Sequence, residues 1–133
     1  MFTGFGPNNF YANYKNYTAN IFKTYFSDNP EHLTVHNYYL LTAVEQGFIG
    51  LLLFYLLLCM MFLHIQRLYN IFKNNFYRTV TLTTGIVISM IAIINSMSDM
   101  IETDKIGSLF WLSVGVIIVL DQKLKDEKDS IAL

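Results

Sequence analysis

Three long runs without a charged residue limit what this chain can fold into. They cover residues 46–66, 79–98 and 106–120, hold 21, 20 and 15 residues, and are mainly apolar. A bilayer core about 30 Å thick needs roughly 20 helical residues, so the first two runs can cross it and the third needs its flanks. Charged residues make up 14% of the chain, against about 25% in an ordinary soluble domain. We therefore expect an all-α polytopic membrane protein fragment with three transmembrane helices, all within residues 44–120.

The charges and the cysteine content exclude several other classes. Nine basic residues against ten acidic residues give a net charge of -1, which leaves no basic surface for nucleic acid. The single cysteine, Cys59, lies inside the first apolar run, so no internal disulfide is possible. Asp99, Glu102 and Asp104 could imitate a metal site, but no histidine or ligand spacing supports one. We expect a solvated acidic loop there, with no metal and no cofactor.

The N-terminal region, residues 1–43, is polar and rich in aromatic residues. Its first 35 residues carry nine of the chain's 21 aromatic side chains. Between residues 9 and 26 the spacing predicts an amphipathic helix resting on the membrane surface, with one face formed by Phe10, Tyr14, Tyr17, Ile21 and Tyr25. Residues 27–30, Ser-Asp-Asn-Pro, indicate a turn, and a second helix is expected to begin near His36 or Asn37.

The loop charges predict an orientation in the membrane. The loop after the first run contains Arg67, Lys73 and Arg78 and no acidic residue, whereas the loop after the second run is acidic. The positive-inside rule then places the first loop and the tail, residues 121–133, in the cytoplasm, and residues 1–43 outside. Because nothing in those 43 residues would deliver them outside, we expect the chain to be the C-terminal part of a larger polytopic protein.

The most informative pattern opens the first apolar run. His36 and Asn37 are followed by nine residues and then by Gly47-x-x-Gly50. On one continuous helix, Gly47 lies about 20° and Gly50 about 40° from His36, so the three share a face. Small residues let another helix approach closely, so we expect Gly47 and Gly50 to be packing residues and His36 to lie at the external mouth of the helix pair. Glu45 would point to the opposite side.

A His-Asn pair, nine residues and Gly-x-x-Gly at the start of a transmembrane helix resemble the O-antigen ligase family, which shares a C-terminal domain with the O-antigen polymerases. The similarity continues at Gly4, Phe5, Gly6, Phe10, Ser98, Asp99, Phe110, Trp111 and Gly115. It implies a metal-free enzyme of the bacterial inner membrane that transfers a glycan from a polyprenyl diphosphate carrier to an acceptor hydroxyl on the outer side. The acceptor would be lipid A core in a ligase and another repeat unit in a polymerase.

The chain departs from this family at the donor site. The family's diphosphate-holding arginines lie in the external loop or ahead of it, but no arginine precedes Arg67 here. The donor site is therefore incomplete, and we expect the missing N-terminal part of the same protein to be a partner, together with the lipid-linked donor, the acceptor and the membrane.

The implied chemistry suits a histidine. A sugar hydroxyl is a poor nucleophile, and a positioned imidazole can accept its proton near neutral pH as the bond to the anomeric carbon forms. We expect His36 to be this catalytic base; the plainer alternative is a surface histidine at a helix start. Asn37 would orient the imidazole or cap the helix. Glu45, at the membrane edge, would orient or bind substrate, or be structural.

A protein of a different class also fits the three apolar runs. This would be a non-catalytic membrane protein, such as a transporter fragment or a small partner subunit. Transporters tend to place ionisable residues near the middle of the membrane, and the centres of these runs contain none. That absence counts modestly against transport, and both forms of the non-catalytic alternative stay open.

Overall fold

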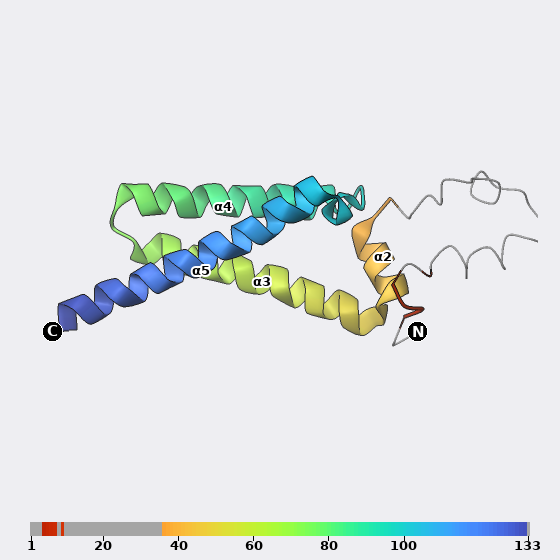
Figure 1. Cartoon of the computed structure of the whole chain (residues 1–133), viewed down its shortest axis with the longest axis horizontal. Helices are drawn as coiled ribbons and strands as arrows, with labels where there is room; N and C mark the ends of the chain where they lie inside the picture. Colours follow the sequence, from red (N-terminus) through yellow and green to blue (C-terminus); the bar gives the residue numbers. More distant parts are fainter. Residues whose placement is uncertain (1–3, 8, 10–35, 133) are drawn as a thin grey trace, which may run out of the picture. The chain divides into compact units, whose positions relative to one another are not determined.

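Every element in the described part of the chain is a helix. The computed structural model describes residues 4–7, 9 and 36–132, with side chains up to residue 126. In chain order these form α2 (Tyr38–Glu45), α3 (Gly47–Ile71), α4 (Asn75–Ile94), the short 3-10 helix η1 (Met100–Glu102) and α5 (Asp104–Ala132) (Figure 1). The expected all-α class is confirmed. Apart from Asn9, the helix expected over residues 9–26 and the turn at 27–30 lie outside the described residues.

The chain divides into two units. The first contains the chain up to Tyr55 together with Asn95–Asp99, and so holds α2, the beginning of α3 and the segment that follows α4. The second contains Leu56–Ile94 and the chain from Met100 onward, which is the rest of α3 with α4, η1 and α5. All five predicted site residues belong to the first unit.

Helices α3 and α4 are long and apolar enough to cross a membrane. In their most apolar windows only 11% and 22% of the residues are buried, whereas the core helix of a soluble protein is mostly buried. Leu53, Leu63 and Ile93 are each at least 60% exposed, as side chains facing lipid would be. Among the described helices, α3 and α4 are the two that combine the length and the apolar composition needed to cross a membrane. The third predicted span, residues 106–120, lies within α5 and stays a prediction.

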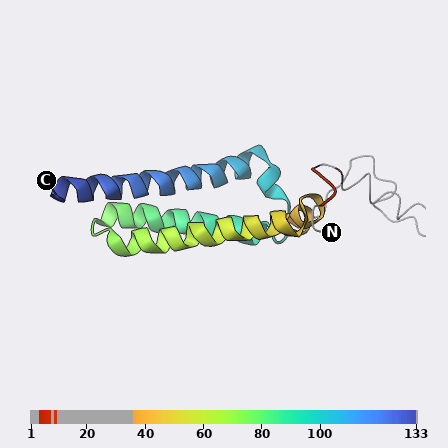
Figure 2. The ribbon, with the colours of Figure 1, turned by 90° about the horizontal axis from the view of Figure 1, so that it is seen from below.

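In the second unit α4 packs against α5, and α3 and α4 run in opposite directions (Figure 2). Leu68 of α3 and Ile88 of α4 are fully buried. A Cβ on Gly85 would lie 3.1 Å from Cγ2 of Ile65, so this glycine lets the two helices approach closely.

Hydroxyl groups within these helices are satisfied by their own backbone. Thr81, Thr84 and Ser89 each donate to the carbonyl oxygen four residues earlier, over 2.7, 2.9 and 2.8 Å. Ser113 of α5 does the same over 2.8 Å. A hydroxyl in hydrocarbon has no water to bind, so these bonds let polar residues remain inside apolar helices.

The boundaries of the elements differ from the uncharged runs. α3 continues to Ile71, beyond the expected end at residue 66, and α4 ends at Ile94, ahead of the expected end at residue 98. α5 continues without interruption to Ala132, so residues 121–132, expected as a separate tail, extend the helix that contains the third run. Backbone hydrogen bonding carries a helix into polar sequence, so charge alone does not mark its end.

Candidate active site

The His36-Asn37 pair stands at the N-terminus of α2. Asn37 has extended backbone angles, φ -161° and ψ 109°, and its Oδ1 accepts a hydrogen bond from the Leu40 amide over 3.0 Å. This arrangement is an N-cap, in which a side-chain oxygen satisfies one of the free amides of the first helical turn. The expected cap at Asn37 and the expected helix start are both confirmed. His36 lies directly before the cap and is exposed.

The amide nitrogen of the Asn37 side chain forms a hydrogen bond to a distant part of the chain. Its Nδ2 donates to the carbonyl oxygen of Ser96 over 2.8 Å, and the Tyr38 amide donates to the carbonyl oxygen of Asn95 over 2.9 Å. One side chain therefore caps α2 and ties that cap to the segment after α4. These two bonds hold the backbone that carries His36 against Asn95 and Ser96.

The side-chain amide of Asn95 is an unusual buried polar group in the segment that follows α4. The residue is fully buried, and neither Nδ2 nor Oδ1 of its side chain has a hydrogen-bond partner among the described residues. Leaving a buried donor or acceptor unsatisfied costs about 1 to 3 kcal/mol. A ligand or water that reached this amide would recover that cost.

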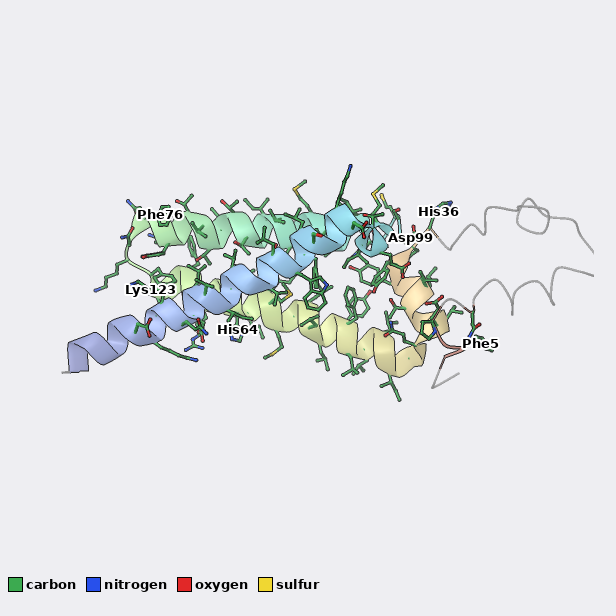
Figure 3. The ribbon with its side chains drawn as sticks, in the orientation of Figure 1. Phe5, His36, His64, Phe76, Asp99 and Lys123 are labelled. Carbon is green, nitrogen blue, oxygen red and sulfur yellow. The ribbon has the colours of Figure 1, made fainter. Side chains whose placement is uncertain are left out.

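Asp99 ends the same segment. It is half-buried, and Figure 3 shows it at the same end of the molecule as His36. The sequence predicts Asp99 in a solvated acidic loop, and no local pattern connects Asn95 or Ser96 with His36. The cluster Asn95, Ser96, Ser98 and Asp99 at the end of the second apolar run is the signal that could have suggested a shared site. Within the described ranges, no three histidine, cysteine or acidic side chains gather as metal ligands would.

The structure corrects the expectation of one continuous helix through His36, Gly47 and Gly50. α2 ends at Glu45, and α3 begins at Gly47, whose φ is +77°. A residue with a side chain rarely adopts this left-handed conformation, so Gly47 serves the turn between the two helices. A Cβ on Gly50 would meet the side chain of Gln46, its neighbour one turn earlier, rather than a second helix. The shared helix face is therefore absent.

Aromatic contacts show why the chain must break at this point. The rings of Tyr38 and Phe54 lie 5.3 Å apart edge to face, and those of Tyr39 and Tyr55 are stacked at 5.1 Å. On a continuous helix, residues 38 and 54 would be about 24 Å apart along the axis. The turn at Gly47 folds α2 back along the start of α3, and this burial raises the pKa of the Tyr39 phenol, with a further contribution from Tyr55.

The N-terminal glycines complete this turn. The amides of Phe5 and Gly6 donate to the carbonyl oxygens of Val44 and Glu45 over 3.0 and 2.8 Å, which satisfies carbonyls that the end of α2 leaves free. A Cβ on Gly4 would overlap the backbone of Glu45 and Gly47, so glycine is required for this close approach.

Glu45 lies at the opposite end of α2 from His36. The residue is half-buried in the last turn, and nine residues separate it from His36 in the sequence, about 13 Å along a helix axis. A direct pair between the two side chains would not fit this geometry. The structure thus brings His36, Asn37, Asn95 and Asp99 to one end of α2, and Glu45, Gly47 and Gly50 to the other.

Comparison with known proteins adds no relative. No protein-family model, no curated protein and no solved structure matches the chain.

Proposed function

We propose that this chain is the C-terminal part of a membrane glycosyltransferase that transfers a glycan from a polyprenyl diphosphate carrier to an acceptor hydroxyl. The observation that carries the proposal is the position of His36. It is exposed, it lies outside the two membrane-crossing candidates, and the Asn37 side chain ties its backbone to the segment that follows α4. An exposed imidazole next to a backbone that these hydrogen bonds hold in place is available to act as a general base.

In the proposed reaction His36 accepts the proton of the acceptor hydroxyl. The acceptor oxygen then forms a bond to the anomeric carbon, while the bond from that carbon to the diphosphate oxygen breaks. The polyprenyl diphosphate leaves with the electron pair and needs cations, not a proton, to stabilise its charge. Asn37 positions the imidazole.

The cations for the diphosphate are proposed to come from the N-terminal part of the protein. The chain has no arginine ahead of Arg67, which lies near the far end of α3 from Gly47. The acceptor is lipid A core in a ligase or a repeat unit in a polymerase, and these two share the same chemistry at His36.

A transfer assay tests the function. A labelled glycan on polyprenyl diphosphate is supplied in vesicles to the chain alone and to the chain together with the N-terminal part. We expect transfer to the acceptor with both parts and none with residues 1–133 alone, because the cations that bind the diphosphate are then missing. Transfer by the chain alone would contradict the fragment assignment, and no transfer by the two parts together would contradict the glycosyltransferase.

The proposed setting is the bacterial inner membrane, with residues 1–43 external and the loop around Lys73 and the C-terminus cytoplasmic. We expect a membrane-impermeant thiol reagent to label a single cysteine placed at Phe5 in whole cells, in a Cys59→Ser background. A cysteine placed at Asn70 should react only after the membrane is permeabilised. Labelling of position 70 in intact cells would reverse the topology and place His36 on the cytoplasmic side.

A further inference from the structure

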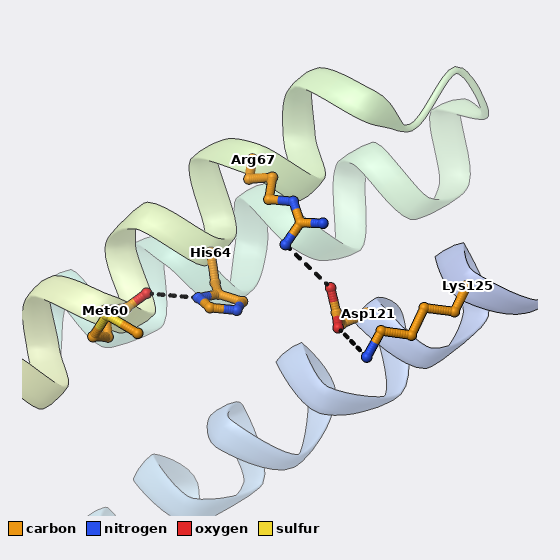
Figure 4. Close-up of polar contacts among 5 residues, drawn as sticks. All are labelled: Met60, His64, Arg67, Asp121 and Lys125. Carbon is orange, nitrogen blue, oxygen red and sulfur yellow. Dashed lines mark hydrogen bonds and ion pairs between the residues drawn. The ribbon is translucent and has the colours of Figure 1, made fainter. Parts of the chain in front are cut away.

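In the second unit an ion pair joins the residues that end the first and the third apolar runs. Arg67 is the first charged residue after Glu45 on α3, and Asp121 is the first after Lys105 on α5. Nη1 of Arg67 lies 3.9 Å from Oδ1 of Asp121, and Nζ of Lys125 lies 3.2 Å from Oδ2 (Figure 4). Twenty residues separate Arg67 from Gly47, about 30 Å of helix, which is the thickness of a bilayer core. A span that enters the bilayer at Gly47 would therefore place the cluster at the level of lipid head groups on the other side.

A groove runs from this cluster toward the apolar parts of α3 and α5. Its volume is about 260 Å³, and its lining changes from apolar at Met60, Ile117 and Ile118 to polar at Asp121 and Lys125. Since a water molecule occupies about 30 Å³ of liquid, the groove has room for a phosphate ester and the carbons next to it. The gradient of polarity along the groove matches that of a phospholipid at the edge of the membrane.

The charges at the polar end favour an anion. Two cations, Arg67 and Lys125, share the single carboxylate of Asp121, so one positive charge remains. Their side chains are 53% and 70% exposed, which leaves donors free for a second partner. His64 is turned onto its own helix, with Nδ1 3.1 Å from the Met60 carbonyl oxygen.

We propose that this groove binds one anionic glycerophospholipid of the surrounding bilayer. Arg67 and Lys125 hold the head-group phosphate in competition with the carboxylate of Asp121, and the first part of an acyl chain lies against Met60, Ile117 and Ile118. Basic pockets between membrane helices on the cytoplasmic side bind anionic head groups in this way. The proposal requires only a membrane location and does not depend on glycan transfer.

Lipid retention tests the groove. The full chain is placed in nanodiscs containing phosphatidylcholine and phosphatidylglycerol, and native mass spectrometry identifies the lipid that stays bound after mild extraction. We expect phosphatidylglycerol to be enriched over its share of the nanodisc. Arg67→Gln and Lys125→Gln should each reduce the enrichment about fivefold, the effect expected of one basic residue near an anionic surface. The matched control, Lys73→Gln with Lys123→Gln, removes two charges that neither line the groove nor pair with Asp121, and it should retain the enrichment.

Asp121→Asn separates this proposal from a purely structural ion pair. Losing the carboxylate frees both cations, so the enrichment should increase. Ile118→Trp fills the apolar half of the groove and should reduce retention of either lipid. Equal retention of the two lipids by the unaltered chain would overturn the proposal, as would an equal loss in the control pair or a decrease in Asp121→Asn. Dimers that Ile118→Trp abolishes would instead assign the groove to a second copy of the chain.

Discussion

His36→Ala in the complete protein is expected to abolish glycan transfer while leaving membrane insertion and protein level unchanged. His36 is exposed and lies ahead of the first residue of α2, so its removal opens no cavity and breaks no helical hydrogen bond. General-base catalysis is worth about 10² to 10⁴ in rate, and the loss should fall in that range. Transfer rates measured at equal protein level in vesicles check this expectation.

His32→Ala is the control for this experiment. It removes a second histidine from the same stretch of sequence, four residues earlier, and should change the rate little. Near-normal transfer by His36→Ala would reduce His36 to a surface histidine. If His36→Ala disappears from the membrane while His32→Ala does not, the role of His36 is structural, and the catalytic assignment is lost.

Asn37→Asp should lower the transfer rate while keeping α2 intact. The aspartate retains an oxygen that can accept the hydrogen bond from the Leu40 amide, but it loses the Nδ2 that donates to Ser96. Aspartate is as good an N-cap as asparagine, so the helix should start at the same residue. The backbone beside His36 is then held against the segment after α4 by the Tyr38 amide alone, and a displacement of about 1 Å from the reacting atoms can cost about 10² in rate.

Asn37→Ala serves as the comparison, because it removes both hydrogen bonds. It should lose a similar factor in rate and, in addition, about 1 kcal/mol of helix stability from the missing cap. The measurements are the turnover number, the Michaelis constant for the acceptor, and proteolytic cleavage within α2. If Asn37→Asp transfers normally and only Asn37→Ala is slow, Asn37 acts solely as a helix cap and the link to Ser96 has no part in catalysis.

The sequence was sufficient where the determining interactions are local. An uncharged apolar run must form its own backbone hydrogen bonds in lipid, so residues 46–66 and 79–98 become the helices α3 and α4. Asn37 was recognisable as a cap because its side chain bonds to an amide only three residues away. The all-α class follows from the same local rules. The glycosyltransferase assignment and the third span stay predictions.

The break between α2 and α3 depends on contacts between residues that are distant in the sequence. Helical periodicity placed His36 and Gly47 on one face, but the ring contacts of Tyr38 with Phe54 and of Tyr39 with Tyr55 fold α2 back, and this requires a left-handed turn at Gly47. No spacing in the sequence predicts this turn, since a periodic pattern describes a helix only while the helix is unbroken.

The same reason explains the two polar clusters. Asn37 meets Ser96 across 59 positions of sequence, and Arg67 meets Asp121 across a similar separation, so neither pairing has a local pattern. The sequence determined which segments are apolar helices and where polar residues interrupt them. The packing of those helices alone decided that His36 lies beside the Asn95–Asp99 segment and that the first charges of α3 and α5 meet, because only packing brings such distant residues within hydrogen-bond or ion-pair reach.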